Sequence, residues 1–255
     1  MITSSTPTAH LARVYELLIA TYGKPEWIPD YDPLGGLIGT ILSQHTSDIN
    51  SERAYQHLIA TFPRWEEVRD APTNEVAHAI RSGGLANVKA VRIQDALHTL
   101  MEQQKAAGHS GSLSEYLYEE LTRRSPEEAW RYLRRIPGVG PKTAACVLMF
   151  NMKQPVMPID THVHRVSKRL GLIGPKVSAD QAHETFAKFT PPEWVYPLHV
   201  NLIRHGRQVC HAQRPECGRC TLYGECAYVG SVNAQETVLS SEALSESGKN
   251  ISEIL

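Results

Sequence analysis

Four of the chain's five cysteines stand within one short stretch, CHAQRPECGRCTLYGEC. Such crowding is typical of metal ligands rather than of side chains that only pack. The spacing is C-x6-C-x2-C-x5-C, and only one pair has the C-x2-C separation that structural zinc sites usually offer twice, so it fits zinc poorly. A cubane iron–sulfur cluster, in which each iron is held by one cysteine, suits four thiolates. The candidate ligands are Cys210, Cys217, Cys220 and Cys226.

A second chemical candidate is the stretch IPGVGPKTA. Gly138 and Gly140 permit a tight turn whose backbone N–H groups face outward, at the start of a helix that begins near Pro141. Donors at a helix N-terminus favour an anion such as a phosphate, although an ordinary helical corner explains the glycines as well. Lys142 lies in the first helical turn, where the like-signed partial charge favours its neutral, nucleophilic form. Such an amine can attack a sugar C1′, and a solvated surface lysine is the alternative.

The third candidate is Asp160 in MPIDTHVHRV. An aspartate before Thr161 is a good helix N-cap, and the residues alone favour that interpretation. A capped carboxylate is also fixed in place, as a catalytic group must be. It could then accept a proton from a lysine or stabilise positive charge that develops at a sugar.

The elements that would hold these groups are helices. Apolar residues recur at helical spacing, as in Leu34, Leu37, Ile38, Ile41 and Leu42, and no convincing alternating strand pattern is present. Helix starts are predicted at Ser125-Pro126-Glu127-Glu128 and at Ser178 with Gln181, each a capping box. We therefore predict an all-α chain of about a dozen helices, followed by a disordered tail over 231–255.

Composition is that of a soluble globular protein, with 42% hydrophobic and 21% charged residues. A net charge of −1 does not by itself indicate nucleic-acid binding. The start MITSSTPTAHLARVYELL has no continuous apolar run, so we expect no signal peptide. No segment approaches a membrane span. We expect a reducing, cytoplasmic location.

Taken in chain order, the glycine hairpin, Lys142, Asp160 and the four cysteines resemble the endonuclease III family of DNA glycosylases, over about residues 10–228. IPGVGPKTA is similar to the family's helix–hairpin–helix, which implies that Lys142 is the catalytic lysine. IDTH is similar to its aspartate motif, which implies that Asp160 is catalytic. HGRQVC and the cysteine spacing resemble its [4Fe-4S] ligand run. The resemblance further implies that Gly138, Val139, Gly140 and Thr143 of the hairpin bind DNA.

Two upstream stretches resemble the family's segments that enter the duplex. GLANVKA resembles the loop that wedges a leucine into the opposite strand, here Leu85. ILSQHTSD resembles the helix end that fills the gap left by a flipped base. The family commonly has Ser-Ala-Gln there, whereas this chain has Ser43-Gln44-His45. Alignment favours His45 as the inserting residue, with Gln44 beside it, and does not settle which one acts.

The first loop between the cysteines departs from the resemblance. It is often strongly basic in the family, but HAQRPE keeps only Arg214 and adds Glu216. We expect fewer phosphate contacts there, and hence weaker and less salt-dependent nonspecific binding. The resemblance nevertheless implies that the cysteine region places Arg204, Arg207, Arg214 and Arg219 near DNA.

The resemblance implies two helical domains with a DNA-binding cleft between them. A barrel-like domain with the hairpin would span 34–152, and a discontinuous cluster domain would combine 1–33 with 153–230. The implied activity is that of a monomeric, bifunctional DNA glycosylase and AP lyase of base excision repair. It would remove oxidised pyrimidines such as thymine glycol from double-stranded DNA, near the nucleoid. The alternatives are a lyase-free adenine or mismatch glycosylase, a non-enzymatic DNA-binding module and a zinc-stabilised protein with no nucleic-acid role. Lys142 together with Asp160 argues against the last of these.

Overall fold

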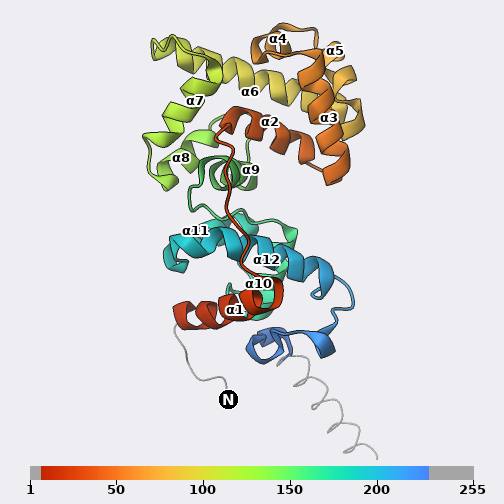
Figure 1. Ribbon diagram of the computed structural model, residues 1–255, viewed down its shortest axis with the longest axis vertical. Coiled ribbons are helices and arrows are strands. Elements are labelled where there is room, and N and C mark those ends of the chain that lie inside the picture. Colours follow the sequence, from red (N-terminus) through yellow and green to blue (C-terminus); the bar gives the residue numbers. More distant parts are fainter. Residues whose placement is uncertain (1–6, 230–255) are drawn as a thin grey trace, which may run out of the picture. The chain divides into compact units, whose positions relative to one another are not determined.

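The computed structural model describes residues 7–229, and these form two compact units (Figure 1). The first, which we call the hairpin unit, is Glu26–Pro158. The second, the cysteine unit, combines Met1–Pro25 with Ile159–Leu255. The chain thus passes between units at 25/26 and 158/159, against the predicted 33/34 and 152/153. The predicted disordered tail, 231–255, lies outside the described residues.

Every regular element in residues 7–229 is a helix, which confirms the all-α prediction. None of these helices has both the length and the apolar character needed to cross a bilayer. The hairpin unit contains ten elements: α2 (Pro33–Ser43), α3 (Asp48–Thr61), α4 (Trp65–Asp70), α5 (Thr73–Ala79), η1 (Arg81–Gly83), α6 (Ala86–Ala106), α7 (Leu113–Thr122), α8 (Pro126–Leu133), α9 (Pro141–Cys146) and η2 (Val147–Asn151).

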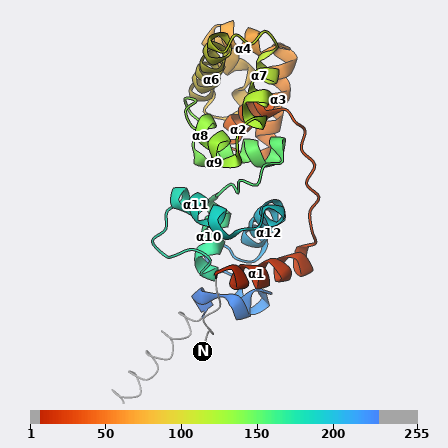
Figure 2. The same ribbon diagram turned by 90° about the vertical axis from the view of Figure 1, so that its left-hand side faces the viewer.

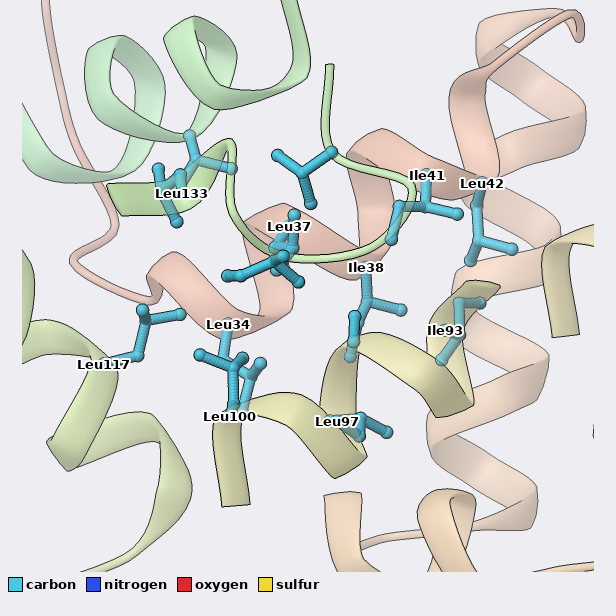
Figure 3. Packing of buried hydrophobic residues seen from close by; sticks show 14 of the residues in the cluster. Leu34, Leu37, Ile38, Ile41, Leu42, Ile93, Leu97, Leu100, Leu117 and Leu133 are labelled. Atoms are coloured by element: carbon cyan, nitrogen blue, oxygen red, sulfur yellow. The ribbon is translucent and has the colours of Figure 1, made fainter. Parts of the chain in front are cut away.

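Helix α2 lies at the centre of the hairpin unit and contacts α3, α6, α7, α9 and η2. Its predicted apolar positions are all fully buried. Figure 3 shows Leu34, Leu37 and Ile38 facing leucines from α6, α7 and α8. A helix that is apolar on most sides can only be stable when other helices surround it. This packing fixes α2, so the residues that follow it start from a rigid base.

The cysteine unit contains α1 (Pro7–Tyr22), α10 (Thr161–Leu170), α11 (Ala179–Phe189), η3 (Pro192–Trp194), α12 (Val195–Gln208), η4 (Cys217–Arg219) and η5 (Tyr223–Glu225). Helix α12 packs against both α10 and α1 (Figure 2). Leu11, Val14 and Leu18 form the fully buried stripe of α1.

Helix α1 is also tied to the cysteine-rich end of the unit by side chains. The Arg13 guanidinium donates to the Glu225 carboxylate at 3.0 Å, and His10 Nε2 lies 3.0 Å from the Glu225 carbonyl oxygen. Thr21 donates to Thr221 at 3.1 Å. Helix α1 is therefore held both by its packing against α12 and by side-chain bonds to the cysteine-rich end of the unit.

The predicted helix starts are confirmed. Ser125 and Ser178 each form a capping box with the residue three positions later, at the starts of α8 and α11. Asp160 caps α10, and behind it Val163 and Leu170 are buried. These caps are local hydrogen bonds between neighbours in sequence, which is why residue type and spacing suffice to predict them.

Candidate functional site

The turn between α8 and α9 uses its two glycines differently. Gly138 has φ +77°, and a Cβ there would lie 3.3 Å from Cγ of Arg92. Gly140 has an ordinary φ of −84°, and a Cβ there would meet nothing within 4 Å. Only Gly138 therefore needs glycine for its backbone conformation. Gly140 instead leaves the outer surface of the turn bare.

The amide groups of this turn divide in the same way. Val139 N–H donates to the Ile136 carbonyl at 3.1 Å, and the Val139 side chain is buried. The N–H groups of Gly138 and Gly140 have no acceptor within residues 7–229. Trp130 Nε1 donates to the Pro141 carbonyl at 3.0 Å and ties α8 to the start of α9. Two hydrogen bonds thus fix the turn, while the amides of Gly138 and Gly140 remain without an acceptor among the described residues.

Lys142 is exposed in the first turn of α9, which continues directly into η2. No partner among the described residues forms a hydrogen bond or ion pair with its ammonium. Its neighbour Thr143 is buried instead. The amine is therefore accessible from solvent beside the donors of the turn.

Asp160 belongs to the cysteine unit and is partly buried. Its Oδ1 accepts a hydrogen bond from the Val163 amide at 2.7 Å, and its own carbonyl accepts from His164 N–H at 2.9 Å. Within residues 7–229, Oδ2 has no hydrogen-bond partner. One oxygen is thus fixed by the helix start, while the other is available.

The structure brings Gln44, Thr143 and Arg92 together. Gln44 Nε2 donates to Thr143 Oγ1 at 3.3 Å, and Arg92 NH1 donates to Gln44 Oε1 at 2.8 Å. The amide of Gln44 is therefore engaged within the hairpin unit. Sequence reasoning missed Arg92, which also packs beside Gly138. Its position on α6, seven residues after Leu85 and so two turns along, was the available signal.

His45 and Leu85 are both exposed and both adopt a left-handed backbone. His45 has φ +54° in the turn after α2, and Leu85 has φ +49° just before α6, with 58% of its surface exposed. Left-handed non-glycine residues are uncommon and are concentrated at functional sites, because surrounding structure must enforce them. Both predicted insertion residues therefore stand at strained, protruding turns.

The four clustered cysteines line a single cavity in the cysteine unit, together with apolar side chains that include Val166, Leu170 and Val209. Burial raises the pKa of the Cys220 and Cys226 thiols. Arg169 NH1 lies 3.3 Å from Cys210 Sγ, and Cys226 Sγ lies 3.3 Å from the Arg169 carbonyl oxygen. The thiols therefore share one partly apolar chamber.

Four thiols around one cavity are a donor set that suits an iron–sulfur cluster. Zinc would draw four sulfur atoms to about 2.3 Å from one centre. A cluster that takes one cysteine per iron holds the sulfur atoms farther apart around a common cavity.

The arginines of the cysteine unit differ in availability. Arg214 is exposed with φ +50°. Arg204 donates to the Tyr22 carbonyl at 3.2 Å, while Arg219 pairs with Glu216 and donates to the Gln208 carbonyl at 2.6 Å. The last two guanidinium groups are thus partly engaged within the protein. The isolated charge of Arg214 is the more accessible one for an external anion.

Residues 38–192 match the family model described as HhH-GPD superfamily base excision DNA repair protein. Endonuclease III of Thermotoga maritima is 32% identical over 197 residues, which cover 77% of this chain and 84% of that protein. "Putative DNA glycosylase At3g47830" of Arabidopsis thaliana is 38% identical over 174 residues, or 68% of this chain. The aligned region spans only 56% of that plant protein.

Solved structures show the same fold. A trapped endonuclease III–DNA covalent intermediate, described as an estranged-adenine complex, has a TM-score of 0.70 and 27% identity, covering 91% of this chain and 99% of its own. A non-covalent endonuclease III–DNA complex gives the same score and identity, with 92% and 100% coverage. A thermostable thymine-DNA glycosylase also has a TM-score of 0.70, but at 17% identity it is similar in fold alone.

Proposed function

Because the chain belongs to the HhH-GPD superfamily of base excision DNA repair proteins, as a member like endonuclease III, we propose that it is a bifunctional DNA glycosylase and AP lyase. Its substrates in this proposal are oxidised pyrimidines such as thymine glycol, and abasic sites, in double-stranded DNA. The protein acts as a monomer in the cytoplasm. The target nucleotide must leave the stack, because C1′ is shielded in duplex DNA.

The observation that carries the proposal is the placement of Lys142. Its amine is exposed, unpaired within the described residues and directly after a turn with two unsatisfied amide donors. Those donors are suited to a backbone phosphate, which would position the strand without reading its sequence. A phosphate docked at Gly138 and Gly140 brings the sugar–phosphate backbone next to the nucleophile.

The proposed reaction begins when the neutral amine of Lys142 attacks C1′. The Nζ–C1′ bond forms as the glycosidic bond breaks, and the base leaves with the bonding electrons and receives a proton. Loss of a proton from nitrogen and opening of the sugar ring give an imine. Removal of a C2′ proton then breaks the C3′–O bond, so the strand is cut 3′ to the site. Water hydrolyses the imine and restores the amine.

Asp160 is the proposed partner carboxylate. Its Oδ2 is available to accept a proton from the Lys142 amine or to stabilise positive charge at the sugar, while the bond from Val163 N–H holds Oδ1. Because this hydrogen bond already fixes the Asp160 side chain, the carboxylate needs no further ordering during the reaction.

His45 is the proposed residue that fills the gap of the flipped base, and Leu85 the wedge in the opposite strand. Gln44 is engaged by Thr143 and Arg92, whereas His45 protrudes. In this proposal Gln44 does not enter the duplex. Its bond to Thr143 links the gap-filling turn to α9, the helix that carries Lys142.

Cys210, Cys217, Cys220 and Cys226 would hold a [4Fe-4S] cluster, in agreement with their shared cavity. The cluster supplies metal–thiolate bonds that organise the end of the cysteine unit, where hydrophobic burial is slight. In this proposal the chemistry at the sugar belongs to Lys142 and Asp160.

The test is borohydride trapping on duplexes that contain thymine glycol or an abasic site. The wild-type protein should release the base and form a covalent adduct, and Lys142→Ala should abolish the adduct. Lys105→Ala removes another exposed lysine of the same unit, on α6, and should trap like the wild type.

Two results would contradict the proposal. Base release without an adduct would identify a lyase-free glycosylase. Binding to damaged duplex with neither adduct nor base release would identify a non-enzymatic DNA-binding module.

A further inference from the structure

Lys89 is a buried cation that the proposed chemistry does not use. It lies on α6, four residues after Leu85, and only 1% of its surface is exposed. No Asp or Glu among residues 7–229 forms an ion pair with it. Burial, with a further contribution from Arg92, lowers the pKa of its ammonium. An uncompensated buried charge is unfavourable compared with an apolar side chain of similar size, so its presence calls for another reason.

The ammonium of Lys89 joins two separate turns. Nζ donates to the Leu42 carbonyl at 2.6 Å and to the Gly83 carbonyl at 2.7 Å. Leu42 is in the last turn of α2, three residues before His45, where the helix dipole favours a cation. Gly83 is two residues before Leu85. The Lys89 backbone N–H also donates to the Leu85 carbonyl at 3.0 Å, so the wedge turn is held on both sides.

The two turns need such support because both are strained. His45 and Leu85 have left-handed backbones, and Gly84 between Gly83 and Leu85 has φ +66°. A Cβ on Gly83 would lie 3.1 Å from Ala54 Cβ, so this turn is also pressed against α3. Conformations of this kind persist only when the surroundings over-determine them. Hydrogen bonds from a charged donor are among the stronger ones available.

We propose that Lys89 is a positioning residue that couples the gap-filling turn to the wedge turn, so that His45 and Leu85 enter the duplex as one preset pair. The inference rests on the proposed function, because it assigns Lys89 to the same DNA site. It predicts a defect in handling duplex DNA rather than in the chemistry of Lys142.

Gln94 provides a matched control on the same helix. It is also buried, and its Nε2 donates to the carbonyls of Val68 at 3.0 Å and Ala71 at 2.8 Å. It therefore braces the α4–α5 segment just as Lys89 braces the two DNA turns. Lys89→Met and Gln94→Met each remove a buried polar brace from α6, and thermal unfolding checks that both variants are folded.

The first measurement is the rate of borohydride trapping under single-turnover conditions. Lys89→Met should trap roughly tenfold or more slowly on an abasic duplex, because small misplacements of positioning groups are costly. It should match the wild type on a single-stranded abasic oligonucleotide, which has no opposite base to displace. Gln94→Met should match the wild type on both. Lys89→Gln keeps two N–H donors without the charge, and should show a smaller loss confined to duplex DNA. If Lys89→Met does not fold, Lys89→Gln is compared with the wild type in its place.

The second measurement uses 2-aminopurine opposite the abasic site, with all proteins in a Lys142→Ala background. Fluorescence then reports displacement of the opposite base without any chemistry. Its change on binding should shrink with Lys89→Met and persist with Gln94→Met. If the proposed function fails, wild-type protein forms no adduct on either substrate, yet this measurement still tests Lys89.

The inference is overturned if Lys89→Met and Lys89→Gln handle duplex DNA as the wild type does. It is equally overturned if they slow trapping on single-stranded and duplex DNA by the same factor, since that indicates general damage near Lys142.

Discussion

Asp160 combines a structural and a proposed chemical task in one side chain. Its Oδ1 caps the start of α10 by accepting a hydrogen bond from Val163 N–H, and its Oδ2 is available for the proposed reaction. Asparagine caps helices about as well as aspartate, but it carries no charge. The two tasks can therefore be separated by substitution.

We predict that Asp160→Asn keeps the stability of the wild type within a few tenths of a kcal/mol. The rate of adduct formation should fall by roughly 10²–10⁴-fold, the range of a lost acid–base group. Asp160→Ala should show the same loss of rate and also lose about 1 kcal/mol of stability. Thermal unfolding and single-turnover trapping measure the two effects. An asparagine variant with wild-type rate would remove Asp160 from the chemistry.

Other residues of the site differ in how well the sequence predicts them. Lys142, Asp160 and the four cysteines stand in short motifs whose spacing is visible in one dimension. Arg92 and Lys89 were not predicted, because each has a partner far away in sequence: Gln44 is 48 residues from Arg92, and Leu42 is 47 from Lys89. The motif GLANVKA does not itself indicate whether its lysine is exposed or buried.

At the scale of elements, the hairpin turn offers two glycines with opposite requirements. Gly138 needs its conformation and packs on Arg92, whereas Gly140 has an ordinary φ and open space in front. Gly138 is therefore required for the folded conformation of the turn, whereas Gly140 leaves space for a ligand to approach it.

We predict that Gly138→Ala loses roughly 1–2 kcal/mol of stability through its left-handed backbone, together with DNA affinity. Gly140→Ala should be as stable as the wild type or slightly more stable, because it restricts the unfolded chain. Its methyl group should nevertheless weaken binding to abasic duplex by roughly tenfold, about the value of one charge-assisted hydrogen bond. Denaturation and titration of labelled duplex test this pair. Unchanged affinity in Gly140→Ala would mean that no phosphate docks there.

Helix starts were the best-predicted feature at this scale. The boxes at Ser125 and Ser178 and the cap at Asp160 all form as spacing indicates. The π-helical turn η2 was not predicted, since α9 and η2 read as one continuous apolar run. A tertiary contact accompanies it, because Trp27 Nε1 donates to the Met149 carbonyl at 2.7 Å. Helical periodicity does not reveal such local widening.

At the scale of the whole molecule, the cysteine unit is built from two distant pieces of chain that meet at Glu225. Arg13 and His10 on α1 bind this residue next to Cys226. A cluster bound by these cysteines would therefore stabilise α1 as well as the loop that holds the cluster.

We predict that the purified protein has an absorption band at roughly 400 nm, as iron–sulfur proteins do. Removing the iron should abolish this band and expose the amides of α1 and of residues 210–226 to hydrogen exchange. The amides of α2, inside the separate core of the hairpin unit, should stay protected. Protection of α1 that survives iron removal would show that α12 alone is sufficient to hold it.

The discontinuous cysteine unit also has a consequence for synthesis. A ribosome releases α1 long before it makes α12 and η5, the segments that pack against α1. Residues 26–158 can fold meanwhile around α2, because domains generally fold as units during translation. Until α12 is made, the apolar stripe of Leu11, Val14 and Leu18 lacks its packing partner, and during that interval α1 is accessible to chaperones and proteases.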